Sequence, residues 1–287
     1  MDPVSYVRGE LSQAIFARIS GPEADAARER IHLTPGERRF GFDDPIGRVH
    51  SDASMIIGGL RALLLQSLHP LAMAGVAQHS RFREDPMGRL HATSRWVATT
   101  TFATLEDVDR EVRIVKAMHK KVKGTTSDGR PYDATDPDLL RWVHVAEIDS
   151  FLRAHDRYGT NPLKGADRDV YVDQAGVAAR LLGASDVPST EAELAEALAA
   201  FRPDLESTPE ARETARWLVT ASHLSLTERA PYTILTAAAV GLLPRWTRWP
   251  LRLPWLPVIE ATGVRLSATT LTRTMHWAML ANRPETP

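Results

Sequence analysis

Apolar residues recur along most of the chain at intervals of three and four, the spacing that is typical of an amphipathic helix. The clearest stripe leads into the segment VKAMHKKVKG and consists of Val108, Val112, Val115, His119 and Val122. Strand signals are nearly absent, because no run of alternating β-branched residues is bounded by turn residues and no Asn-Gly hairpin occurs. The pattern therefore predicts an all-α fold.

Start and stop signals divide this pattern into separate helices. Pro70 should kink or break the first long one, because proline removes a backbone hydrogen bond and clashes with the preceding turn. Asp136-Pro137 offers an N-cap followed by a favoured first helical residue, and Gly183 is a stop signal. The predicted helices cover residues 53–77, 91–102, 104–124, 136–159, 166–182, 191–201, 209–221, 228–243 and 258–280.

The helix that carries His119 has a signal at each end. Thr104 followed by Asp107 looks like a capping box at its start, and Gly124 is expected to close it in the left-handed conformation. The segment TTSDGRPYDATDP that follows is expected to be a loop, because it is rich in Gly, Pro, Asp and Ser, with a turn at residues 127–129.

A single multi-helix domain is the preferred organisation. The loops ASDVPST and RPDLESTPE could mark a boundary between subdomains, but the helices on both sides have apolar faces without an obvious core of their own. We expect residues 1–39 to form an N-terminal helical extension, residues 40–250 the main domain, and residues 251–287 a C-terminal helix packed on it. A chain of 287 residues can bury a core that encloses a ligand-sized cavity.

Composition excludes several classes of function. The chain has 35 basic and 36 acidic residues and a net charge of -1, so nothing electrostatic favours nucleic acid. It contains no cysteine, which excludes disulfides, thiolate metal sites, iron–sulfur clusters and thiolate-ligated haem. The N-terminus MDPVSYVRGELSQ lacks the apolar region of a signal peptide, so a cytoplasmic location is expected.

No apolar window reaches the roughly 18–20 residues that a membrane-spanning helix needs. The segment PRWTRWPLRLPWLP is unusual, because it combines Trp246, Trp249 and Trp255 with arginines and prolines. Such a mixture suits peripheral contact with the interface of a membrane, and it equally suits a proline-rich segment that packs over the core.

Ten histidines are present, but no motif with a fixed mechanism accompanies them: there is no G-x-S-x-G elbow, P-loop, G-x-G-x-x-G or H-E-x-x-H. A histidine on an apolar helix face is more often a hydrogen-bonded core residue than a ligand. His119 differs in that its neighbours three and four residues away are valines, which offer the imidazole no partner. A haem iron could supply that missing partner.

Two further histidines are candidates for a pocket. His69 lies in the apolar segment LLLQSLHPLAMAGV, where Gln66 could bond it at the helix break before Pro70. His144 has Glu147 three residues later, which allows either a His–carboxylate pair or half of a metal site.

Arg89 and Thr93 form a third candidate group. They are four residues apart and share a helical face if the helix begins by Gly88, so together they could hold an anionic or oxygen-bearing group. The alternative is a solvated arginine and a threonine that bonds its own helix backbone.

Three segments in fixed order resemble a known family. LLLQSLHPLAMAGVAQHSRFREDPMGRLHATSRWVATTTFAT is followed by VRIVKAMHKKVKG and by RPYDATDPDLLRWVHVAEIDSFLRAHDRYG. This order is similar to that of the DUF2236 family, which includes the latex clearing proteins, or rubber oxygenases, and the MpaB-type oxygenases. The resemblance covers about residues 40–250.

The resemblance implies an all-helical fold that holds haem b, with iron bound by His119. It also implies that Arg89 and Thr93 are pocket residues beside the haem, where they would serve catalysis. In latex clearing proteins a lysine precedes the threonine, whereas this chain has Ala92, and their catalytic glutamate has no clear equivalent here. Both differences count against cleavage of polyisoprene itself.

The activity implied is therefore that of a haem b-dependent oxygenase, which uses dioxygen to oxidise an apolar, isoprenoid-like small molecule. A neutral histidine ligand would leave the opposite face of the haem open for oxygen. Two alternatives remain: a helical protein of the same fold that binds haem or lipid without turnover, and a scaffold that has lost haem. The sequence does not indicate an oligomeric state.

Overall fold

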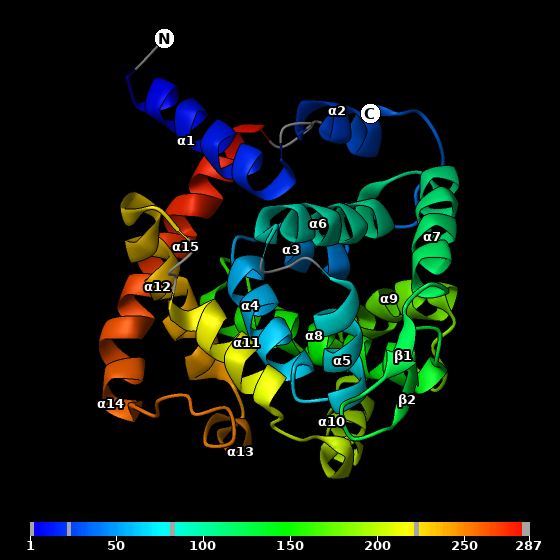
Figure 1. The fold of residues 1–287 in the computed structure, drawn as a ribbon. Helices are drawn as coiled ribbons and strands as arrows, with labels where there is room; N and C mark the ends of the chain where they lie inside the picture. Colours follow the sequence, from blue (N-terminus) through cyan, green and yellow to red (C-terminus); the bar gives the residue numbers. More distant parts are fainter. Residues whose placement is uncertain (1–2, 22–23, 81–83, 221–223, 283–287) are drawn as a thin grey trace.

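The computed structural model describes residues 3–21, 24–80, 84–220 and 224–282. Apart from one small hairpin these residues form helices and connecting loops, which confirms the predicted all-α class (Figure 1). The helices are α1 (Pro3–Ser20), α2 (Ala24–Arg28), α3 (Pro45–His50), α4 (Met55–Gln66), α5 (Pro70–His79), α6 (Pro86–Phe102), α7 (Leu105–His119), α8 (Pro137–Tyr158), α9 (Asp167–Leu182), α10 (Glu191–Ala200), α11 (Pro209–Thr220), α12 (Leu226–Leu242), α13 (Arg245–Arg248), α14 (Pro257–Ile259) and α15 (Arg265–Met279).

Helix α8 is the centre of the molecule, because residues on almost all of its faces are buried. Trp142, Val145 and Leu152 are completely enclosed by the main hydrophobic core. Helix α4 lies directly against α8, and Gly58 permits the close approach: a Cβ atom there would come within 2.9 Å of Cδ1 of Phe151. In Figure 1, α6 crosses above these two helices, α7 stands beside it, and α15 runs along the opposite side.

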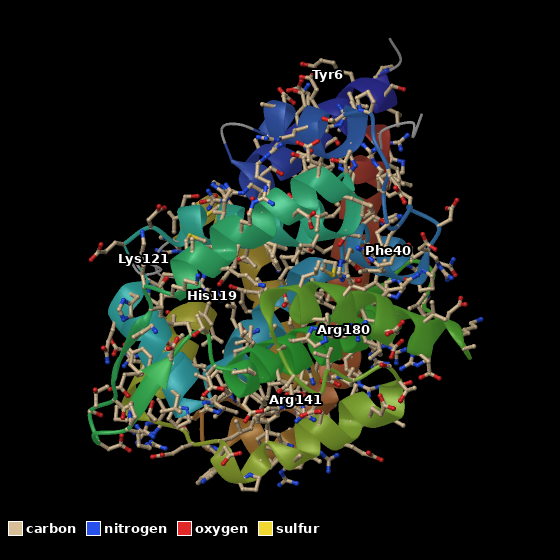
Figure 2. The ribbon with its side chains drawn as sticks, turned by 90° about the vertical axis from the view of Figure 1, so that its right-hand side faces the viewer. Tyr6, Phe40, His119, Lys121, Arg141 and Arg180 are labelled. Atoms are coloured by element: carbon tan, nitrogen blue, oxygen red, sulfur yellow. The ribbon has the colours of Figure 1, made fainter. Side chains whose placement is uncertain are left out.

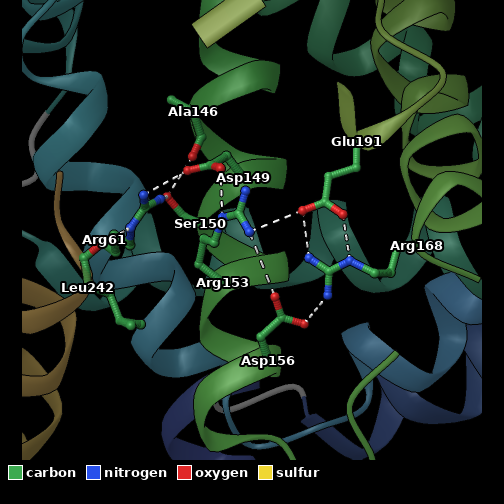
Figure 3. Close-up of polar contacts among 9 residues, drawn as sticks. All are labelled: Arg61, Ala146, Asp149, Ser150, Arg153, Asp156, Arg168, Glu191 and Leu242. Carbon is green, nitrogen blue, oxygen red and sulfur yellow. Dashed lines mark hydrogen bonds and ion pairs between the residues drawn. The ribbon is translucent and has the colours of Figure 1, made fainter. Parts of the chain in front are cut away.

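A network of buried charges joins the central helices (Figure 3). Arg61 on α4 pairs with Asp149 on α8 at 2.7 Å and donates to the carbonyl of Leu242 on α12 at 3.0 Å. Arg153 links Asp149 to Glu191 on α10, where its Nη1 donates to Oε1 of Glu191 at 3.1 Å. Four helices are thus tied together by charge-assisted hydrogen bonds.

Most of the predicted helix boundaries are confirmed. Helices α4 and α5 meet at Pro70 with an angle of 107° between them. The hydroxyl of Thr104 accepts a hydrogen bond from the backbone of Asp107 at 3.3 Å, and Asp136 caps α8 by accepting from the backbone of Asp138 at 2.8 Å. Gly183 ends α9 with φ +111°. The last residue of the predicted helix 209–221 lies outside the described residues.

The prediction for Gly124 is wrong. Helix α7 ends at His119, and Gly124 lies in strand β1 (Lys123–Thr125), which pairs antiparallel with β2 (Pro131–Asp133) inside the segment predicted to be a loop. Glycine is needed because a Cβ atom here would lie 2.5 Å from Oη of Tyr132. Strands of three residues are too short to show alternation. The turn between them is as predicted: the amide of Gly129 donates to the carbonyl of Thr126 at 3.0 Å.

The first and the last long helix of the described residues pack together. Helix α1 packs against α15, and Arg8 donates to the carbonyl of Trp277 at 2.9 Å. Among the described residues no single helix is long and apolar enough to cross a membrane, although α4 and α5 meet the length and composition test as a bent pair.

Candidate functional site

The apolar stripe of α7 changes its surroundings along the helix. Val108 and Val112 are buried in a small core with Ile31 and Phe102. Val115 and His119, further along the same face, are only half-buried, and Met118 beside them is exposed. The stripe therefore leaves the packed core just before it reaches His119 (Figure 2).

The imidazole of His119 is unpaired among the described residues and is available to bind a metal ion. The described residues provide it with no hydrogen-bond partner, although it is half-buried. Burial lowers its pKa from the ordinary value, and the charge of Arg89 lowers it further. His119 is therefore neutral at neutral pH, and a neutral imidazole nitrogen is the form that binds a metal ion.

Arg89 lies on α6, close enough for its charge to act on His119. The helix begins at Pro86, where Asp85 caps it by accepting from the backbone of Gly88 at 2.8 Å, so the predicted shared face of Arg89 and Thr93 does form. Burial also lowers the pKa of Arg89, although solvent reaches its side chain.

A hydrogen bond joins the side chain of Thr93 to the backbone of Arg89. The Thr93 hydroxyl donates to the carbonyl of Arg89 at 3.0 Å, and the Arg89 guanidinium donates to Oγ of Ser80 at 3.2 Å. The hydroxyl proton of Thr93 is therefore used within its own helix, as in the alternative drawn from the sequence. Its oxygen can still accept a hydrogen bond.

His69 lies elsewhere, in an aromatic cluster. It is buried at the start of α5, with its ring centroid 6.0 Å from that of Trp142 and 6.4 Å from that of Phe201. Gln66 bonds His69 through the backbone, where the amide of His69 donates to the carbonyl of Gln66 at 3.2 Å, whereas the Gln66 side chain donates to the carbonyl of Val143 at 3.1 Å and not to the imidazole. Nδ1 of His69 is buried without a partner. No contact in the described residues connects His69 with His119.

His144 is buried on α8, and its expected pairing with Glu147 is not seen: its Nε2 atom has no partner. Burial, together with the charge of Arg180 on α9, lowers the pKa of His144 to about 3. Glu147 is half-buried, and burial raises its pKa to about 7. Within the described ranges no three His, Asp or Glu side chains come together as a metal site, so the half-site interpretation gains no further ligand.

His50 is a polar group that the sequence did not single out. Its Nδ1 lies 2.8 Å from Oγ1 of Thr101 and its Nε2 lies 3.4 Å from Oη of Tyr171, so it joins α3 to α6 and α9. Burial lowers its pKa to about 3. Nothing in the sequence around it distinguished this histidine from the other nine.

Two surface pockets lie away from His119. One, of about 550 Å³, lies at the start of α7 and is lined by Arg30 and Asp107. The other, of about 430 Å³, opens beside the Arg61–Asp149 pair and reaches Trp246. Both are lined by side chains that already pair with one another, and His119 lines neither of them.

The comparison with known protein families gives one match. A family model described as the catalytic domain of ER-bound oxygenase mpaB/B' and rubber oxygenase matches residues 47–278, which run from within α3 to within α15. No curated protein and no solved structure matches the chain. Because the match covers well over half of the chain, this protein belongs to the mpaB and rubber oxygenase catalytic-domain family, and its family is one of oxygenases.

Proposed function

We propose that this protein is a haem b-dependent oxygenase that binds iron through His119 and uses dioxygen to oxidise an apolar, isoprenoid-like small molecule. The observation that carries the proposal is the imidazole of His119: it is neutral, half-buried and without a hydrogen-bond partner among the described residues. The chain has no cysteine, so a thiolate-ligated haem is excluded, and a neutral histidine nitrogen is a common axial ligand of haem b.

The residues around His119 have separate roles in this proposal. Haem would supply the one-electron and dioxygen chemistry that no amino-acid side chain provides. Burial favours the neutral form of His119 by lowering its pKa, the charge of Arg89 adds to this, and Arg89 offers guanidinium donors to an anionic or oxygen-bearing group. Thr93 acts as an acceptor and holds the Arg89 backbone through its hydroxyl. Both residues are therefore proposed as pocket residues and as part of the catalytic machinery.

An apolar substrate agrees with the accessible side chains of the central helices. Leu63 on α4 and Val143 on α8 are exposed although their helices form the core of the molecule, and Ile114 and Met118 on α7 are exposed as well. Ligand sites are lined mainly by apolar side chains with few polar groups. A substrate that resembles a prenyl chain would suit this lining.

The absorption spectrum tests the haem. Protein purified from a host that is supplied with haem should show a Soret band, and His119→Ala should lose most of it, because the axial nitrogen is gone. His91→Ala is the matched control: this imidazole lies on the side of α6 that faces α1 and is bonded to the carbonyl of Arg18 at 3.2 Å. A colourless wild-type protein, or equal loss in both variants, would contradict the proposal.

Oxygen consumption tests turnover separately. The haem-loaded protein should consume dioxygen when isoprenoids are added, and Arg89→Gln should slow this consumption while leaving the Soret band in place. If the protein binds haem and consumes no oxygen with any isoprenoid, the alternative of a haem- or lipid-binding protein without turnover is the better description.

A further inference from the structure

The segment from Trp249 to Leu266 exposes an unusual amount of apolar surface. Six large apolar side chains of this short segment are between 49% and 90% exposed: Trp249, Trp255, Leu256, Val258, Ile259 and Leu266. We call this set the C-terminal apolar patch. It follows the loop from α13 to α14 and the neighbouring end of α15 (Figure 1). Exposed apolar patches of this kind mark interaction surfaces.

Trp246, which the sequence grouped with the other two tryptophans, is not part of the patch. It is half-buried against the main core, and the guanidinium of Arg202 stacks over its ring at 5.0 Å. Trp249 and Trp255 therefore remain as the exposed tryptophans of the segment.

The charge around the patch is positive. Between residues 244 and 280 there are five arginines and one acidic residue, Glu260, which gives five minus one, or +4, in a chain whose net charge is -1. Glu260 is neutralised by the buried Arg248, whose Nη1 lies 2.8 Å and 2.9 Å from its two oxygens. Arg252 and Arg265 are exposed on the same segment as the patch.

The patch is held firmly in place. Arg248 also donates to the carbonyl of Gly241 at the end of α12, at 2.7 Å, and Glu260 accepts from the backbone of Leu256 at 2.9 Å. Arg245 lies over the ring of Trp255 at 5.3 Å. The apolar side chains are thus presented by a braced segment rather than by a loose tail.

We infer that the C-terminal apolar patch binds peripherally to the surface of an anionic lipid bilayer. Tryptophan rings favour the boundary between water and hydrocarbon, and clustered arginines are attracted to anionic headgroups. The exposed Trp, Leu, Ile and Val side chains suit the apolar part of such a surface. The arginines suit its negative charge, since the carboxylate of the segment, Glu260, is already paired. This inference does not depend on haem or on the proposed reaction.

Vesicle flotation tests the inference. The full-length protein should float with phosphatidylcholine vesicles that contain about 30% phosphatidylglycerol, bind neutral vesicles much less, and be released by about 1 M salt, which screens the arginines. Trp249→Ser combined with Trp255→Ser should lower the bound fraction roughly tenfold, because both rings lose their place at the interface. Arg252→Gln combined with Arg265→Gln should weaken binding to anionic vesicles alone.

Leu226→Ser is the matched control. Leu226 is also highly exposed and apolar, but it lies at the opposite end of α12, near α1. This variant should float as the wild type does. The inference is wrong if the wild-type protein does not float with anionic vesicles, or if the Leu226 variant loses as much binding as the tryptophan variant. It is equally wrong if the patch instead holds two copies together, so that the tryptophan variant turns a dimer into a monomer and vesicles bind neither form.

Discussion

His119 and Glu147 are both half-buried, and the described residues provide neither side chain with a hydrogen bond. Burial shifts their pKa values in opposite directions, downward for the histidine and upward for the glutamate, and in both cases toward the neutral form. The sequence predicted that His119 faces inward. The family resemblance implied that Arg89, thirty positions earlier, shares a pocket with His119, whereas the helical periodicity could not, because that proximity depends on how α6 and α7 pack.

Glu147→Gln should stabilise the protein at alkaline pH and have little effect at acidic pH. The folded pKa of Glu147 is about 7, above its ordinary value of 4.5, so folding favours the protonated form. Both states are protonated below pH 4.5, whereas above pH 7 the folded state must hold a buried charge. The free energy of unfolding of the wild type should therefore fall by about 1–3 kcal/mol between these limits.

Urea unfolding of the wild type and the variant at pH 5 and pH 8 would measure this difference. Glu196→Gln, at an exposed position of α10, is the control and should change stability about equally at both pH values. A constant difference between wild type and Glu147→Gln across this range would show that Glu147 does not titrate as expected.

At the scale of helices, the contact between α4 and α8 depends on one buried ion pair. Arg61 and Asp149 are both almost fully enclosed and 2.7 Å apart. Asp149→Ala should destabilise the fold by about 3–5 kcal/mol, because it leaves the Arg61 guanidinium buried without its counter-charge. Asp173→Ala removes the partner of Arg180 in an exposed pair, and it should cost about 1 kcal/mol or less. Equal midpoints for the two variants in chemical unfolding would contradict this account.

Helix boundaries could be predicted where a local signal sets them. Asp136, Thr104 and Gly183 act as caps or stops because each depends only on its own few residues. Gly124 carried the same kind of signal, yet its conformation is set by Tyr132 in the opposite strand, eight residues away. Local patterns indicate how a helix begins and ends, and they miss glycines that are required by a tertiary contact.

At the scale of the molecule, the order of three segments predicted the family, and the family match confirms it. The positions of the other candidates could not be predicted in this way. His69 lies with Trp142 and Phe201, and His144 lies near Arg180, because of how α5, α8 and α9 pack on one another. The periodicity of a helix shows which residues face inward, but it does not show which neighbouring helix they pack against.

The N-terminal extension predicted for residues 1–39 contains two parts that contribute differently to stability. Helix α1 buries only Ser12 and Ile15, against α15 and α6. Residues 29–39 instead cover the core beside α7: Ile31 packs with Phe102 and Val108, and the carbonyl of Glu37 accepts from the backbone amide of Leu105 at 2.9 Å. Residues 29–39 should therefore contribute more to the stability of the fold than helix α1.

A pair of shortened chains would separate these contributions. Removal of residues 1–21 should cost about 1–2 kcal/mol and lower the melting temperature by a few degrees, because little apolar surface becomes exposed. Removal of residues 1–39 should cost several kcal/mol more, because it uncovers Phe102, Val108 and Val112 and takes away the Glu37 carbonyl that accepts from the backbone amide of Leu105. It should also weaken any Soret band, since the exposed face of α7 leads directly to His119. If both shortened chains melt at the same temperature, residues 29–39 are not part of the core that positions α7.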